Sequence, residues 1–106
     1  MKDTNINKNI AIIGHMGSGK SVLGSLIAKK LNISHIDSDN LIEAKTNKTI
    51  NEIFTYKGEQ AFREIEEKTI LGINYEKKFV ISLGGGSILS PRIRQYLKKY
   101  FISIFL

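Results

Sequence analysis

The chain has 106 residues, a formal net charge of +6 and no cysteine. This length suits one small domain, and the lack of cysteine excludes disulfides and cysteine-ligated metal sites. The polar first residues and the absence of a long apolar run predict neither a signal peptide nor a membrane span, so we expect a cytoplasmic protein without a membrane partner. The lysines are scattered and not interleaved with aromatic residues, a pattern that argues against nucleic acid as a partner.

The first predicted elements are a buried strand, a glycine-rich loop and a helix over about residues 21–31. The strand is the β-branched run Asn9–Ile13, and the loop Gly14–Ser21 reads G-x-x-x-x-G-K-S. In this setting the loop N–H groups and the helix N-terminus bind phosphate, Lys20 reaches the β/γ-phosphates and the Ser21 hydroxyl ligates Mg²⁺. A glycine-rich turn with no ligand would require neither of these two side chains. The pattern therefore predicts nucleotide binding.

The next strand, over residues 34–37, ends in Asp37-Ser38-Asp39. These aspartates either cap the following helix, as most turn aspartates do, or lie beside Mg²⁺·ATP. The nearby phosphate loop favours the second interpretation. Two short helices should follow, beginning near Asn40 and at Thr49, because each of these residues has a glutamate three positions later, as in a capping box. Gly58 should end the second.

A longer helix is predicted over about residues 59–75, and it carries Arg63. Glu59, Glu66 and Glu67 lie four residues before, three after and four after this arginine. Periodicity alone therefore predicts a solvent-exposed ion-pair partner rather than a ligand-binding residue.

The third strand, over residues 79–83, runs directly into Gly84-Gly85-Gly86. These glycines form either a tight turn or a loop whose bare N–H groups approach a ligand. Ser90-Pro91 predicts the start of a helix, and residues 102–106 predict a fourth strand. Strands that alternate with helices indicate an α/β fold with a parallel sheet. The loops after the first three strands should meet at the carboxyl edge of that sheet, where such folds bind ligands.

Taken together, these motifs resemble the shikimate kinase family. The resemblance is carried, in order, by Gly14–Ser21, Asp37-Ser38-Asp39, Gly58–Glu66 and Leu83–Gly86. It implies a three-layer α/β/α P-loop NTPase fold of the nucleoside-monophosphate-kinase type, with strand order 2-3-1-4 and without the family's fifth strand. It also implies ATP-dependent phosphorylation of the shikimate 3-hydroxyl, which yields 3-phosphoshikimate and ADP in chorismate and aromatic amino acid biosynthesis.

The resemblance also assigns roles to individual residues and turns Arg63 into an expected ligand for the shikimate carboxylate. It implies that Lys20 and Asp39 are catalytic, with Asp39 either orienting the acceptor hydroxyl or accepting its proton. The implied nucleotide-binding residues are Gly17, Ser18, Gly19, Lys20, Ser21 and Val22; the implied metal residues are Ser21 and Asp37; and the implied shikimate-binding residues are Asp39, Arg63, Gly84, Gly85 and Gly86. Phe54, Phe62 and Glu66 match positions around the same pocket.

Shikimate kinases continue past this length with a lid arginine, a second carboxylate-binding arginine, an adenine loop, a strand and a closing helix. We therefore expect residues 1–106 to be a single P-loop kinase domain, truncated at its C-terminus relative to the family, with weak or no turnover. The family is expected to be monomeric, whereas this chain should self-associate through its apolar last strand. Two alternatives are another small-molecule kinase of the same fold and a nucleotide-binding chain without catalysis.

Overall fold

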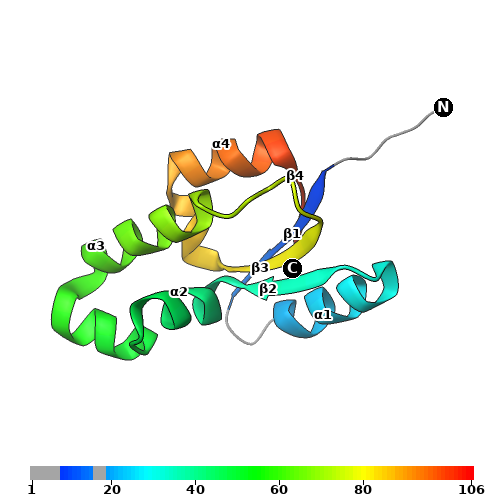
Figure 1. Ribbon diagram of the computed structural model, residues 1–106. Coiled ribbons are helices and arrows are strands. Elements are labelled where there is room, and N and C mark those ends of the chain that lie inside the picture. The colour runs from blue at the N-terminus through cyan, green and yellow to red at the C-terminus, as the bar shows by residue number, and fades with distance from the viewer. Residues whose placement is uncertain (1–7, 16–18) are drawn as a thin grey trace.

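The computed structural model describes residues 8–15 and 19–106 (Figure 1). In chain order its elements are β1 (Asn9–Gly14), α1 (Lys20–Leu31), β2 (Ser34–Asp37), α2 (Ser38–Thr46), α3 (Ile50–Leu71), β3 (Phe79–Gly84), the short 3₁₀ helix η1 (Gly85–Leu89), α4 (Pro91–Tyr100) and β4 (Phe101–Phe105). The four predicted strands are confirmed, each within about one residue of its expected bounds.

The strands form one parallel sheet in the order β2-β3-β1-β4, which confirms the predicted topology. The register places Gly14 of β1 beside Gly84 of β3, and Asp37 of β2 beside Ser82 of β3. The loops that leave β1, β2 and β3 therefore start at neighbouring points on the carboxyl edge, as predicted.

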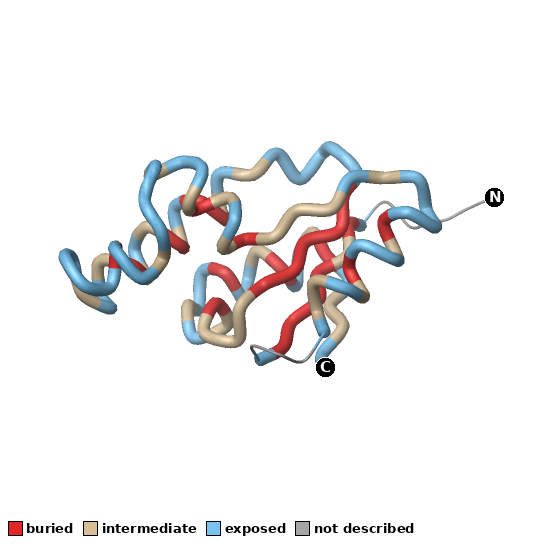
Figure 2. The backbone as a smooth tube through the Cα atoms, turned by 90° about the horizontal axis from the view of Figure 1, so that it is seen from below, coloured by how far each residue is buried: buried red, intermediate tan, exposed pale blue. Residues whose placement is uncertain are grey.

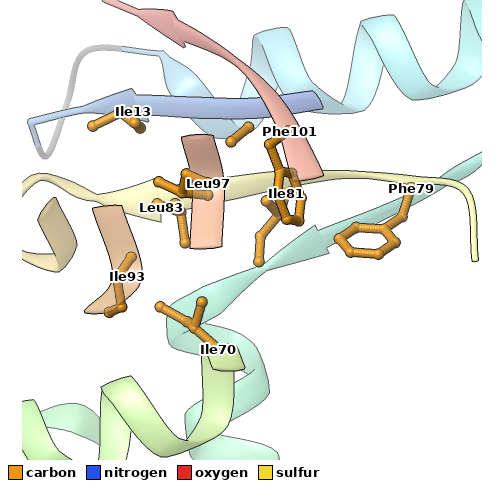
Figure 3. Packing of buried hydrophobic residues seen from close by; sticks show 9 residues of the cluster. Ile13, Ile70, Phe79, Ile81, Leu83, Ile93, Leu97 and Phe101 are labelled. Atoms are coloured by element: carbon orange, nitrogen blue, oxygen red, sulfur yellow. The ribbon is translucent and has the colours of Figure 1, made fainter. Parts of the chain in front are cut away.

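Helices cover both faces of the sheet, because alternate side chains of each buried strand point to opposite sides. On one face Ala28 of α1 packs against Ile12 of β1 and Val80 of β3. On the other face α4 and the end of α3 cover a larger cluster (Figures 1 and 3). The members of this cluster are Ala11, Ile13, Ile70, Phe79, Ile81, Leu83, Ile93, Leu97 and Phe101.

The first half of α3 lies away from the sheet and packs instead against α2 (Figure 2). Ile42, Ile53 and Phe62 form a separate small core there. Gly58 lies inside α3 with φ of 88° and ψ of 171°, so the helix is kinked at the predicted break. This left-handed conformation suits glycine, which has no Cβ. The helix ends at Leu71 and not near residue 75, since Gly72 is its C-cap.

The predicted start of α2 is wrong. Asp37 is the N-cap, and its carboxylate accepts hydrogen bonds from the N–H groups of Asp39 and Asn40 at 3.0 and 3.2 Å. Two donors are thus satisfied before Asn40 could act as a cap. Glu43, the proposed partner of Asn40, instead accepts a hydrogen bond from the Ile50 N–H at 2.8 Å.

The other two predicted caps are confirmed. Thr49 and Glu52 form a reciprocal capping box at the start of α3. At α4, Ser90 accepts a hydrogen bond from the Ile93 N–H at 3.2 Å, with Pro91 in the first turn.

Candidate functional site

The phosphate loop leads from β1 into the first turn of α1. Gly19 caps α1 with φ of 87°, a conformation that L side chains rarely adopt, and Lys20 and Ser21 are the first two helical residues. Their amides therefore lie in the helix turn whose N–H groups have no helical partner and suit an anion. Val22 is 66% exposed. Gly17 and Ser18 lie outside the described residues.

Ser21 and Asp37 join α1 to the end of β2. The Ser21 hydroxyl donates to one carboxylate oxygen of Asp37 at 2.6 Å, while the other oxygen caps α2. The helix-cap interpretation of Asp37 is therefore confirmed, and its role beside Mg²⁺·ATP stays a prediction. The carboxylate is a helix cap, and it also holds the hydroxyl expected to ligate a metal.

Asp39 lies half-buried in the first turn of α2. Burial raises the pKa of this carboxyl above its ordinary value of 3.8, and the negative charge of Asp37 raises it further. The charges of Lys20 and Arg63 act in the opposite direction. Glu43 also raises this pKa. The grouping of Asp39 with Lys20 and Arg63 at one site stays a prediction.

Arg63 is paired with acids, as periodicity predicts, but the pairing is more specific than a surface contact. Its Nη1 lies 3.0 Å from Glu66 Oε1 and its Nε lies 3.8 Å from Glu59. Glu66 is buried, and its second oxygen accepts a hydrogen bond from Ser87 at 2.9 Å. The Nε atom of Arg63 is itself buried without a hydrogen-bond partner, although the side chain as a whole is 33% exposed. Glu67 does not join this group and instead pairs with Arg92 at 3.5 Å.

The three glycines after β3 differ in what surrounds them. A Cβ at Gly86 would lie 2.5 Å from both terminal nitrogens of Arg63. A Cβ at Gly85 would lie 3.5 Å from His15 Nδ1, at the start of the phosphate loop, and one at Gly84 would meet nothing within 4 Å. Close approach is thus required at Gly86, where the backbone of η1 lies directly under the guanidinium.

Two hollows flank the site. The first has a volume of about 340 Å³ and is lined by Arg63, Glu66 and Gly86 among others. The second has a volume of about 440 Å³, and its lining includes Ser21 and Asp37. Asp39 lines neither. A third, apolar hollow of about 400 Å³ lies beside Ile13, Leu97, Phe101 and Phe105 and contains none of the predicted site residues.

The donors present fit a magnesium ion that is bound mainly by phosphate. Among residues 8–15 and 19–106, no group of three His, Cys, Asp or Glu side chains gathers as a metal cage. The hydroxyl of Ser21 and the carboxylate of Asp37 are nonetheless adjacent oxygen ligands at the phosphate loop. Mg²⁺ is commonly held by one or two such groups together with substrate phosphates and water.

Three polar residues at this edge were not predicted from the sequence. Ser87 holds Glu66, while Ser82 of β3 and His35 of β2 are hydrogen-bonded to each other at 2.9 Å. Ser82 could have been recognised from the sequence, because it is a serine within an otherwise apolar strand and a buried hydroxyl needs a hydrogen-bond partner. The sequence did not identify that partner.

The family model described as "Shikimate kinase" matches residues 16–106. This chain belongs to the shikimate kinase family. A shikimate kinase of Thermodesulfovibrio yellowstonii is 47% identical over 92 residues, which cover 87% of this chain and 53% of that relative. One of Haemophilus influenzae is 42% identical over 99 residues, which cover 93% of this chain and 55% of the relative. The chain thus spans about half the length of the curated relatives it matches.

Solved structures agree with this membership. A shikimate kinase of Acinetobacter baumannii, described as a complex with shikimate, is 37% identical to this chain and superposes with a TM-score of 0.90. The match covers 93% of this chain and 55% of the Acinetobacter chain. A gluconokinase of Sinorhizobium meliloti matches with a TM-score of 0.51 at 19% identity over 96% of this chain and 58% of its own, which supports the fold alone. Within the described ranges, no helix has both the length and the apolar character needed to cross a membrane.

Proposed function

We propose that residues 1–106 form one P-loop kinase domain of a cytoplasmic shikimate kinase. It binds MgATP at the start of α1 and shikimate between Asp39, Arg63 and the glycines after β3. The reaction transfers the γ-phosphoryl group of ATP to the 3-hydroxyl of shikimate and yields 3-phosphoshikimate and ADP. The observation that carries this proposal is the Arg63 guanidinium, held by Glu66 at 3.0 Å directly against the backbone of Gly86, in a fold whose phosphate loop is followed by the Ser21–Asp37 pair at 2.6 Å.

The nucleotide side of the proposal rests on Lys20, Ser21 and Asp37. Lys20 places a positive charge beside the β/γ-phosphates, and the helix N-terminus adds N–H donors. The pairing of the Ser21 hydroxyl with Asp37 at 2.6 Å presents two oxygen ligands to Mg²⁺. The metal, when bound, supplies charge neutralisation at the phosphates. Gly17, Ser18, Gly19 and Val22 complete the proposed nucleotide set.

The substrate side rests on Arg63, which Glu66 holds at 3.0 Å and whose side chain is one-third exposed. A guanidinium binds a carboxylate through two parallel hydrogen bonds, which orient a small hydroxy acid as well as binding it. Gly84, Gly85 and Gly86 let the backbone approach the same ring. A carboxylic acid with several hydroxyls is the substrate class that such a site recognises.

Asp39 supplies the proton chemistry. Its carboxylate accepts a hydrogen bond from the acceptor hydroxyl and takes the proton as the hydroxyl oxygen forms its bond to the γ-phosphorus. The bond from that phosphorus to the bridging oxygen of ADP breaks in the same step. The raised pKa of Asp39 supports this role, because a more basic carboxylate is a better proton acceptor.

Binding measurements test the two halves of the proposal separately. Calorimetric titrations of the 106-residue chain with MgADP and with shikimate should show that Lys20→Ala weakens ADP binding at least about tenfold and leaves shikimate binding unchanged. Arg63→Ala should do the reverse. Loss of ADP binding in Arg63→Ala, with shikimate binding retained, would contradict the assignment.

Substrate choice needs a separate experiment, because the fold is shared with a gluconokinase. We expect weak turnover at most from this chain, and a coupled ADP-release assay should detect any such turnover with shikimate and none with gluconate. Turnover on gluconate would favour the other small-molecule kinase. ADP binding without turnover on either compound would favour a nucleotide-binding chain without catalysis.

A further inference from the structure

We propose that Ser82 and His35 are positioning residues that hold the first turn of α1, and with it Lys20 and Ser21, in the geometry that binds phosphate. This inference rests on the proposed nucleotide site and adds two residues that do not themselves touch the nucleotide. The juxtaposition that carries it is a hydrogen-bonded chain from β2 through β3 to the backbone of Lys20.

The donor and acceptor roles of the Ser82 hydroxyl, in the middle of this series of hydrogen bonds, can be assigned in only one way. The Ser82 hydroxyl donates to the backbone carbonyl of Lys20 at 3.0 Å. A serine hydroxyl carries a single hydrogen, so Ser82 must accept in its 2.9 Å contact with His35 Nε2. His35 is therefore the donor, and the order is His35 to Ser82 to Lys20.

The sheet register places these groups behind the helix. His35 pairs with Val80 and Asp37 pairs with Ser82, so His35 and Ser82 are diagonal neighbours on the face that α1 covers. Ser82 is 1% exposed. Its hydroxyl therefore has no access to bulk water and depends on the protein partners that it has.

Gly24 shows how closely α1 approaches this pair. A Cβ at Gly24 would lie 2.5 Å from the Ser82 hydroxyl oxygen and 2.7 Å from His35 Nε2. The helix is thus seated on the two side chains with no room for a methyl group. Because packed interiors leave little free space, this close contact fixes the position of the helix relative to the sheet.

The Lys20 carbonyl is in the first helical turn, where its regular partner is the N–H four residues later. Ser82 adds a second donor to this carbonyl from the sheet side. The Ser21 hydroxyl, one residue on, is held from β2 by Asp37 at 2.6 Å. Two strands thus fix two consecutive residues of the turn that carries the phosphate-binding groups.

The experiment compares MgADP affinity and amide hydrogen exchange in the 106-residue chain. Ser82→Ala should weaken MgADP binding about three- to tenfold, the range expected from one neutral hydrogen bond. It should also speed exchange of the Leu23 N–H, which bonds to the Gly19 carbonyl at 2.9 Å in the same turn. Shikimate affinity should not change.

Matched variants separate positioning from general destabilisation. Thr46→Val removes a hydroxyl that donates to the Ile42 carbonyl in α2 at 2.8 Å, so it deletes the same kind of bond away from the loop. It should lower the melting temperature without changing ADP affinity or Leu23 exchange. His35→Leu should resemble Ser82→Ala, and His35→Gln, which keeps an N–H donor, should restore binding to within about twofold of wild type.

Each outcome decides the inference. Unchanged MgADP affinity in Ser82→Ala would overturn it, and so would equal losses in His35→Leu and His35→Gln. If the wild-type chain bound no nucleotide, the proposed function would fail separately. The Leu23 exchange rate would then decide, with faster exchange in Ser82→Ala but not in Thr46→Val supporting the positioning role and equal rates refuting it.

Discussion

Replacing Gly86 with alanine should disturb the substrate side of the site and leave the nucleotide side intact. The added Cβ would lie 2.5 Å from Nη1 and Nη2 of Arg63 and 2.6 Å from its Cζ. Because these atoms end a flexible side chain, the guanidinium will move before the backbone does. Movement separates it from Glu66, now at 3.0 Å, and removes it from the substrate carboxylate.

The magnitude follows from the contact that is lost. A charge-assisted hydrogen bond contributes about 1.5–3 kcal/mol, or roughly ten- to a hundredfold in affinity. The Arg63 side chain is 33% exposed and can swing into water, so the lower end applies and we expect about tenfold weaker shikimate binding. Glu66 keeps its hydrogen bond from Ser87, which limits the loss of stability.

A double-mutant cycle is the assay for this reasoning. Shikimate binding would be followed by NMR titration, which reaches millimolar dissociation constants, in wild type, Gly86→Ala, Arg63→Ala and the double variant. If crowding of Arg63 is the cause, Gly86→Ala should have little further effect once the arginine is gone. An equal loss in both backgrounds, or no loss in wild type, would refute the explanation. MgADP affinity should stay constant throughout.

Two further predictions concern stability and association. The folded-state pKa of Asp39 is raised, so the folded chain binds more protons than the unfolded chain between the two pKa values and loses stability as pH rises through that window. Asp39→Asn should therefore melt at a higher temperature than wild type at pH 7, and the gain should vanish below about pH 3.8, with turnover lost at every pH. A variant that is less stable at pH 7 would contradict this sign. Phe105 and Ile102 of β4 are 66% and 41% exposed, and burying them in a second copy would gain about 25 cal/mol per Å². Light scattering should show a mass that rises with concentration, and Phe105→Lys should reduce it; a monodisperse monomer would count against the association.

The sheet and its ligand edge could be predicted because local patterns and topology agree. Short β-branched runs separated by helical segments specify parallel strands, and the strand order followed from the family resemblance. The position of the loops then follows from geometry alone, since parallel strands end at the same edge. This is why the phosphate loop, Asp37–Asp39 and Gly84–Gly86 could be assigned to one edge before any contact was known, whereas Arg63, which lies within a helix, was assigned to the site by the family resemblance alone.

What could not be predicted depends on pairings between distant residues. Two cap signals competed at the start of α2, and the sequence does not rank the carboxylate of Asp37 above the amide of Asn40. The helical spacing of Arg63 offered three glutamate partners equally. In the structure Glu66 is the nearer partner, at 3.0 Å against 3.8 Å for Glu59, and Ser87, from a different element, donates to its second oxygen. The ion pair that forms thus depends on contacts between distant segments, and the spacing of residues along one helix carries no information about those contacts.

The same segment of chain, β3 with η1, fixes both cations of the proposed site. Ser82, inside β3, donates to the backbone of Lys20, and Ser87, in η1, donates to the acid that holds Arg63. The two residues proposed to bind phosphate and the substrate carboxylate are thus both linked by hydrogen bonds to one short, largely buried stretch of chain. Phosphoryl transfer demands alignment more than covalent chemistry, so a rigid stretch that fixes both ends is what the reaction needs from this fold.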